Sequence, residues 1–212
     1  MALEATHLRF ALSLKDRYGV RDMENFLAGA IYPDSRCLSK IDRQLTHPNG
    51  YADWNLEEVD DFKKGWLTHL IADEIQYRAI EEMFPEIFTD EDILGSETWI
   101  RHTAIKIIQD IDDAKRFDIR SCLPRPESAS NPHEEDIVKV KKFNQICAEF
   151  YSDPDLISPS CYQAKCLKLG IDGQLTDRLI AQTEKYLAEK DIVAAIGGLY
   201  QKMLDNINKD NI

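Results

Sequence analysis

The sequence predicts an all-α protein, organised as a single multi-helix domain. Apolar residues recur three and four positions apart through most of the chain, which is the spacing of one face of an α-helix. No segment shows the strict apolar–polar alternation of a half-buried strand. With 212 residues, of which 43% are hydrophobic, the chain is long enough to bury a sizeable core.

The first two helices are expected at residues 3–18 and 22–31. Asp22 is a suitable N-cap for the second helix, and Pro33 helps to end it just before Asp34. His7 lies on the apolar stripe of the first helix. The other members of that stripe are Leu3, Phe10, Ala11, Leu14 and Tyr18.

An irregular segment is expected at residues 35–55, with a turn at Pro48, Asn49 and Gly50. Asn55 then caps a long helix that ends near Met83. His69 and Asp73 lie along the same side of that helix as its apolar stripe. This stripe consists of Val59, Phe62, Trp66, Leu70 and Tyr77.

A further helix is expected at residues 97–117, and its inward residues are Ile100, Ala104, Ile107 and Ile111. The segment "SCLPRPESASNPHEED" is rich in Pro and Ser and is the clearest candidate for a linker. Asn131 as N-cap and Pro132 at the first helical position predict a helix that continues to Tyr151. Short helices after Pro159 and Thr176, and a last one from about residue 191, complete the chain.

This pattern predicts a metal-binding helical core at residues 1–120 and a C-terminal group of helices, residues 131–212, packed on it. The chain carries 26 Lys and Arg against 38 Asp and Glu, for a net charge of −12. Such a charge argues against general nucleic-acid binding and against docking on anionic lipid. No apolar run is long enough for a membrane span, and the first residues lack a signal peptide, so a cytoplasmic protein is expected. The five cysteines form no CxxC pair and are expected to be free thiols.

Polar residues on the apolar faces of the first half form a candidate metal site. His69 and Asp73 are four residues apart, so they lie on one helix face. His7 belongs to the first helix, Asp34 follows the end of the second, and His47 lies in the irregular segment. Imidazole and carboxylate ligands suit zinc, and also iron or manganese. The candidate metal ligands are therefore His7, Asp34, His47, His69 and Asp73.

Other interpretations of these residues stay open. The same side chains also suit a buried His–Asp hydrogen-bond network, or one structural metal, in a non-enzymatic protein that serves protein interactions. The adjacent His-Asp pair of HD-type phosphohydrolases is absent, and only one of the two ExxH motifs of a di-iron bundle is present, at Glu4–His7. His102 and His133 are expected to be solvated. His102 is also expected to stand away from the site, because it lies half a turn from the inward stripe of its helix.

The order of four segments resembles the zinc-dependent phospholipase C family, in particular its small bacterial members of unassigned function. These segments are "ATHLRFAL", "FLAGAIYPDSR", "QLTHP" and "FKKGWLTHLIADEI". They carry an early His, a Gly-x-x-x-Pro-Asp turn, a Thr-His loop and a Gly-x-x-x-His-x-x-x-Asp helix. The resemblance covers about residues 5–85.

The resemblance implies an all-α fold in which His7, Asp34, His69 and Asp73 hold zinc, with His47 as a fifth ligand. It implies hydrolysis of phosphoesters by a metal-bound hydroxide. The secreted members use three zinc ions, an N-terminal Trp and a later HxxxHxxxE helix, and this chain has neither of the last two. One or two metal ions are therefore expected. The expected substrate is a small cytoplasmic phosphoester; the oligomeric state is not predicted.

Overall fold

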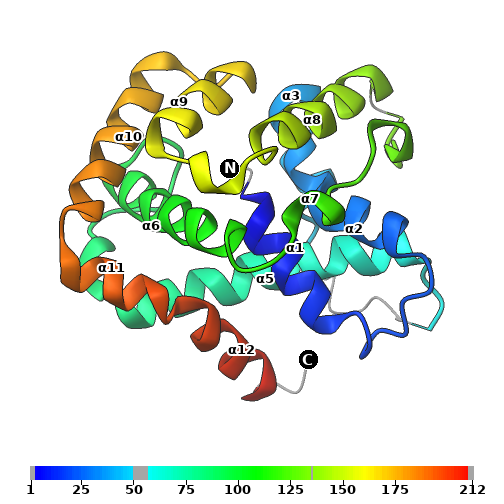
Figure 1. Ribbon diagram of the computed structural model, residues 1–212, viewed down its shortest axis with the longest axis horizontal. Coiled ribbons are helices and arrows are strands. Elements are labelled where there is room, and N and C mark those ends of the chain that lie inside the picture. The colour runs from blue at the N-terminus through cyan, green and yellow to red at the C-terminus, as the bar shows by residue number, and fades with distance from the viewer. Residues whose placement is uncertain (1–2, 50–56, 135, 210–212) are drawn as a thin grey trace.

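The computed structural model describes residues 3–49, 57–134 and 136–209, and every regular element in these ranges is a helix (Figure 1). This confirms the predicted all-α class. The α-helices are α1 (Glu4–Leu14), α2 (Met23–Ile31), α3 (Arg36–Ser39), α4 (Arg43–Thr46), α5 (Asp61–Met83), α6 (Glu97–Ala114), α7 (Ile119–Cys122), α8 (Ile137–Phe150), α9 (Pro159–Lys168), α10 (Gly173–Leu187), α11 (Lys190–Gly197) and α12 (Leu199–Lys209). Short 3₁₀ turns include η1 (Tyr32–Ser35). None of the helices described is both long and apolar enough to cross a membrane.

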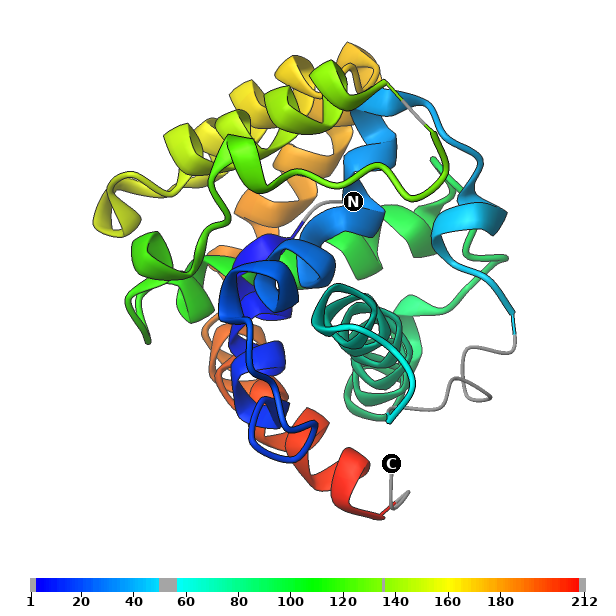
Figure 2. The ribbon, with the colours of Figure 1, turned by 90° about the vertical axis from the view of Figure 1, so that its right-hand side faces the viewer.

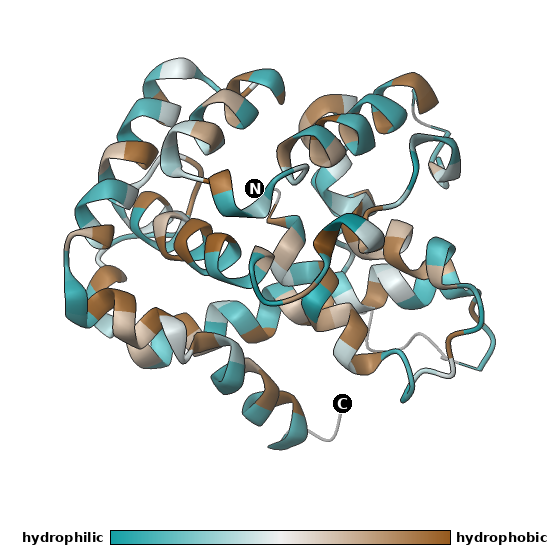
Figure 3. Ribbon diagram, in the orientation of Figure 1, coloured by the Kyte–Doolittle hydropathy of each residue, from teal (hydrophilic) through white to brown (hydrophobic). Residues whose placement is uncertain are grey.

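The helices surround one main hydrophobic core. α1 starts near the centre of the molecule and packs against α2, α5 and α6, and α5 is seen nearly end-on in Figure 2. α9 packs on α10, which in turn packs on α6, while α12 packs on α5. Apolar residues of α8, α10, α11 and α12 belong to the same core cluster as those of α1, α5 and α6. The outward turns of α9 and α10 are mostly hydrophilic (Figure 3).

The predicted start of the second helix is confirmed, because the Asp22 side chain accepts a hydrogen bond from the backbone N–H of Asn25. Two other predicted starts are wrong. The long helix α5 begins at Asp61 with Asp60 as N-cap, whereas Asn55 lies outside the described residues. The helix α8 begins at Ile137 with Asp136 as N-cap, rather than at Pro132. The left-handed backbone of Glu134, with φ at 58°, is incompatible with a helix running through it.

The segment expected to be irregular, residues 35–55, contains the short helices α3 and α4, so that part of the prediction is wrong. These turns are too short to show an apolar period, and the sequence therefore gave no helical signal for them. The Pro48–Gly50 turn extends to Gly50, which lies outside the described residues. The Pro/Ser-rich segment also includes ordered contacts, since Arg125 donates to Glu24 of α2 at 2.7 Å.

Two glycines allow α2 and α5 to pack with their backbones in direct contact. A Cβ on Gly29 would overlap the carbonyl oxygen of Phe62, and a Cβ on Gly65 would overlap that of Phe26. This close approach fixes the end of α2 beside the first two turns of α5. It thereby places η1, which carries Asp34, next to His69.

We expect Gly65→Ala to lower the free energy of unfolding by about 1–3 kcal/mol or more, because the added methyl group forces two packed helices apart. Gly197→Ala is the matched control, since a Cβ there meets nothing within 4 Å. Gly197→Ala should raise the free energy of unfolding by less than about 1 kcal/mol. Urea unfolding of both variants measures the difference. Equal stability of the two would contradict the close helix contact.

The core also contains a buried ionic cluster that joins α1 to α6, α8 and α9. Glu4 and Lys165 form a fully buried ion pair. The hydroxyl of Tyr151 lies 2.9 Å from Glu4 Oε2 and 2.6 Å from Asp110 Oδ2. Tyr162 also donates to Asp110, whose pKa is raised by burial. These contacts fix the start of α1, and therefore the position of His7 one turn later.

Candidate metal centre

The five predicted ligands lie together: the three histidines converge on the carboxylate of Asp73, and Asp34 lies beside His7. His7 comes from α1, Asp34 from η1 and His47 from the residue after α4, whereas His69 and Asp73 share α5. His7 Nε2 lies 3.4 Å from Asp73 Oδ1. His47 Nε2 and His69 Nε2 lie 3.5 Å and 3.7 Å from Asp73 Oδ2. On its other side, His7 Nδ1 lies 3.8 Å from Asp34 Oδ2.

These separations are longer than hydrogen bonds but fit ligand atoms arranged around an ion. A nitrogen–oxygen hydrogen bond spans about 2.7–3.2 Å. Two ligand atoms at about 2.0–2.2 Å from zinc, at the tetrahedral angle, lie about 3.3–3.6 Å apart. The shortest nitrogen–oxygen distances at Asp73, 3.4 and 3.5 Å, fall in the second range. The arrangement is therefore compatible with a cation among these ligand atoms.

In two of the imidazoles, a hydrogen bond from Nδ1 leaves the lone pair on Nε2, the nitrogen that faces Asp73. His69 Nδ1 donates to the carbonyl oxygen of Ala30 at 2.9 Å. His47 Nδ1 lies 2.9 Å from the Thr46 hydroxyl, whose own proton is directed to the carbonyl of Arg43. Metal-bound histidines usually donate their second ring N–H in this way, which fixes the ring and its tautomer.

Burial sets the charge states of the group. Together with the neighbouring His7, burial lowers the pKa of His69 to about 3, so the ring is neutral at neutral pH. His69 Nε2 and His7 Nδ1 are buried atoms without a hydrogen-bond partner among the described residues. Burial alone would raise the pKa of Asp73, but the Lys106 ammonium and the contacts with His47 and His7 hold it well below its usual range. A neutral imidazole beside an ionised carboxylate is the form that binds a metal.

Among the residues that the structure describes, two three-residue groups have ligand atoms within 4.8 Å of one another: His7, Asp34 and His69, and His47, His69 and Asp73. They share His69, which has one free lone pair because Nδ1 is already a donor. One ion at a time can therefore use His69. The first group is buried, whereas Asp73 has 29% of its side chain exposed. Only the second group has the open side that a catalytic site requires.

The open side faces a pocket of about 900 Å³. His47 and Asp73 line it together with Asp34, and its other walls come from α3, α6, residues 92–94 and the turn between α9 and α10. Lys106 of α6 lies 3.4 Å from Asp73. A molecule in the pocket therefore has direct access to the carboxylate on which the histidines converge.

The prediction for His102 is wrong in one respect. Its side chain is buried rather than solvated, and it lines the same pocket as His47 and Asp73, although it does not belong to either ligand group. Its ring lies against those of Tyr77 of α5 and Phe88, with centroids 5.1 Å and 5.9 Å away, so this face of α6 is buried in addition to the predicted stripe. His102 Nδ1 lies 3.1 Å from Asp92 Oδ2. Burial and the Lys106 charge lower the pKa of His102.

His133 was also expected to be solvated, and this too is wrong. It is half-buried, with its ring 5.3 Å from that of Trp66 and 6.5 Å from that of Tyr32. The contact arises because the segment before α8 folds over α2 and α5. His133 is not a member of either ligand group.

The sequence contained one signal for the residues missed on the pocket wall. His102 and Lys106 are four apart on one helix, as His69 and Asp73 are, and so share a face. Asp92 gave no such signal, because it lies in the turn before α6 and meets His102 only in the folded chain.

No protein-family model, curated protein or solved structure matches this chain. The resemblance to the zinc-dependent phospholipase C family therefore stays a prediction.

Proposed function

We propose that the protein is a metal-dependent phosphoester hydrolase that acts on a small cytoplasmic substrate. The observation that carries the proposal is the arrangement of three imidazole Nε2 atoms around the Asp73 carboxylate at an open pocket. His47, His69 and Asp73 would hold the ion, with His7 and Asp34 beside them for the same ion or a second one. Nitrogen and oxygen ligands suit zinc, and also iron or manganese.

A zinc ion bound there would polarise a phosphoryl oxygen and lower the pKa of a bound water to about 7. Residues of the chain would orient the metal ligands and attract the anionic substrate. The carbonyl of Ala30 and the hydroxyl of Thr46 orient the imidazoles. Lys106 places a positive charge beside Asp73 and at the pocket wall, where it favours an anionic group. A liganded carboxylate is poorly placed to act as a base, so proton transfer falls to another residue.

His102 is our candidate for that residue. Asp92 holds its Nδ1, which leaves Nε2 as the acceptor, and Nε2 has no hydrogen-bond partner among the described residues. We expect His102→Asn to lower kcat by about 10²–10⁴-fold without changing the metal content, because a positioned acid–base contributes that much. The pH profile should lose the limb that belongs to the imidazole. An unchanged profile and rate would exclude His102 from proton transfer.

The hydrolase proposal predicts turnover of at least one of three substrates: bis-p-nitrophenyl phosphate, p-nitrophenyl phosphate and a short-chain phosphatidylcholine. Each is assayed with added zinc or manganese. Activity should disappear on chelation and in Asp73→Ala, whereas His133→Ala should keep both metal and activity. A fully metallated protein that hydrolyses none of the three would contradict the proposal.

One observation favours a second candidate function. The group formed by His7, Asp34 and His69 is buried, which is typical of a structural metal rather than a catalytic one. In that case the ion would stabilise a helical interaction protein. A metallated protein that loses stability on chelation, yet is inactive on all three substrates, would support this alternative.

A further inference from the structure

Three cationic side chains form one wall of the pocket, although the chain as a whole has a net charge of −12. They are Arg36 of α3, Lys40 just after it and Arg43 of α4, and we call them the basic wall. Within the described ranges, none of the three forms an ion pair with a carboxylate. Lys40 and Arg43 are exposed and Arg36 is partly buried, so the three line the cavity as one cationic surface.

Two of these cations have donors available for a ligand. Arg36 Nε is buried and has no acceptor in the described part of the chain. The ammonium of Lys40 donates to the carbonyl oxygen of Cys37 at 2.8 Å, which is a neutral partner. Leaving a buried charged donor without an acceptor costs free energy, and a bound anion removes that cost.

The acidic residues of the pocket are engaged elsewhere. Glu74 pairs with Arg78 at 3.0 Å, and Asp92 accepts from His102. Asp172 caps α10 by accepting from the backbone N–H of Leu175. Asp34 and Asp73 belong to the candidate metal centre, where a divalent ion would offset their charge. With a divalent ion bound, the positive charges that line the pocket exceed its negative charges by one, and three of the four cationic side chains belong to the basic wall.

The basic wall adjoins the metal ligands in sequence and in space. Arg36 follows Asp34 by two residues at the end of η1. Arg43 is one helical turn before His47, whose backbone N–H donates to the Arg43 carbonyl at 2.7 Å. All of these residues line the same cavity of about 900 Å³, so one compact molecule reaches both the metal centre and the basic wall.

We infer that the substrate carries a second anionic group, which the basic wall binds while the phosphoester is held at the metal centre. The inference rests on the proposed function for the role of the metal centre. It narrows the substrate class to small, multiply anionic phosphoesters, such as bisphosphates or phosphate esters with a carboxylate. The basic wall would repel a substrate whose second group is a cation.

The test compares propylphosphonate with propane-1,3-bisphosphonate, whose C–P bonds resist hydrolysis. Calorimetric titration of zinc-loaded protein should give about tenfold tighter binding of the bisphosphonate, since each new charge contact at a partly exposed site contributes a few-fold. The net negative charge of the chain opposes such a preference, so it must arise from local cations. Zinc content is measured after each titration, so that extraction of zinc by the ligand is detected.

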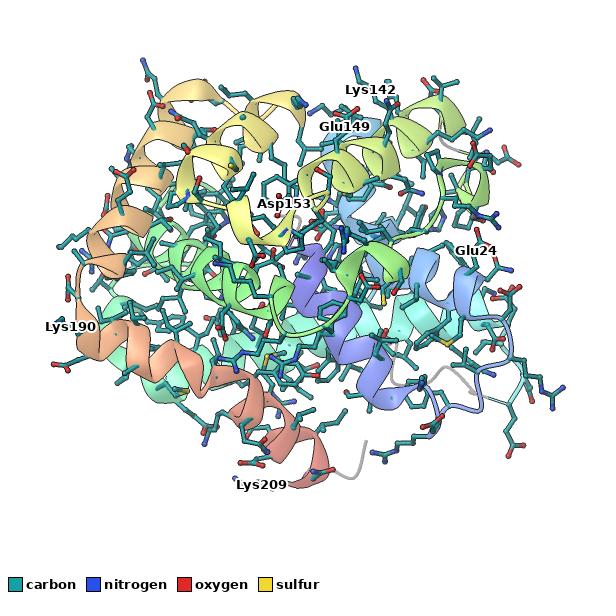
Figure 4. The ribbon with its side chains drawn as sticks, in the orientation of Figure 1. Glu24, Lys142, Glu149, Asp153, Lys190 and Lys209 are labelled. Atoms are coloured by element: carbon teal, nitrogen blue, oxygen red, sulfur yellow. The ribbon has the colours of Figure 1, made fainter. Side chains whose placement is uncertain are left out.

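The variant Arg36→Gln with Arg43→Gln should lose the preference and keep its zinc. Lys142→Gln is the matched control, because it removes one positive charge on the outer surface of α8, away from the pocket (Figure 4). That variant should keep the preference. Equal binding of the two ligands by the wild type, or a preference that persists in the double variant, would overturn the inference. Neither result depends on turnover, so failure of the hydrolase assays remains a separate outcome.

Discussion

His69→Ala is expected to abolish stable metal binding. His69 is the residue shared by both ligand groups, and its Nε2 is held toward the site by the hydrogen bond from Nδ1 to Ala30. Loss of an outer-shell partner of a metal site already costs about 10–100-fold in affinity, so loss of a direct ligand should cost more. Equilibrium dialysis against a competing chelator measures the affinity of the variant and of the wild type.

A folding defect would imitate this result, because the His69 side chain is fully buried. His47→Ala provides the second test, since His47 follows α4 at the pocket wall and packs into the core less tightly. It should weaken metal binding while circular dichroism stays that of the wild type. His133→Ala, outside both groups, is the control that keeps the metal. Full metal retention in both His69→Ala and His47→Ala would refute the ligand assignment.

Lys165→Met is expected to cost about 3–5 kcal/mol of stability, because it leaves the Glu4 carboxylate buried without its cation. Besides the ion pair, the Lys165 ammonium lies 4.4 Å from the ring centroid of Phe150 and 4.9 Å from that of Tyr151. The Glu4 carboxylate would keep only the Tyr151 hydroxyl and the Cys147 thiol as partners. Urea unfolding measures the loss.

Lys168→Met is the matched control on the same helix. Lys168 pairs with Glu149 of α8 at 3.1 Å, but both side chains are about half exposed. Such a surface pair is worth about 0–1 kcal/mol. The double change Glu4→Gln with Lys165→Met should recover most of the stability lost in Lys165→Met, because it removes the uncompensated charge. Similar losses for Lys165→Met and Lys168→Met would show that the buried pair is not a structural anchor.

The convergence of the five ligands was predictable from periodicity and residue type. His7 and His69 lie in register with the apolar stripes of their helices, so burial brings their rings together, with centroids 3.9 Å apart. Asp73 follows from its i, i+4 relation to His69. Asp34 lies in η1 rather than on a helical stripe, so periodicity alone did not place it beside His7.

Three features depended on tertiary contacts and were missed. The pair of Glu4 and Lys165 joins residues 161 positions apart, and no local pattern connects them. The burial of His102 follows from its contacts with Tyr77 of α5 and with Phe88, which cover a face of α6 outside the predicted stripe. The start of α8 was misplaced because Asn131 and Pro132 form a favourable capping sequence locally, whereas the left-handed Glu134 interrupts the helix before it can form.

The metal content of the wild-type protein, purified without chelators or a chelating tag, tests the central claim most directly. Elemental analysis should find zinc, iron or manganese at about one to two ions per chain, as expected for ligand groups that share one histidine. A protein that contains no metal, and that cannot be loaded with zinc, iron or manganese, would contradict the claim. The cluster around Asp73 would then be a buried polar network, and its histidines would have no catalytic role.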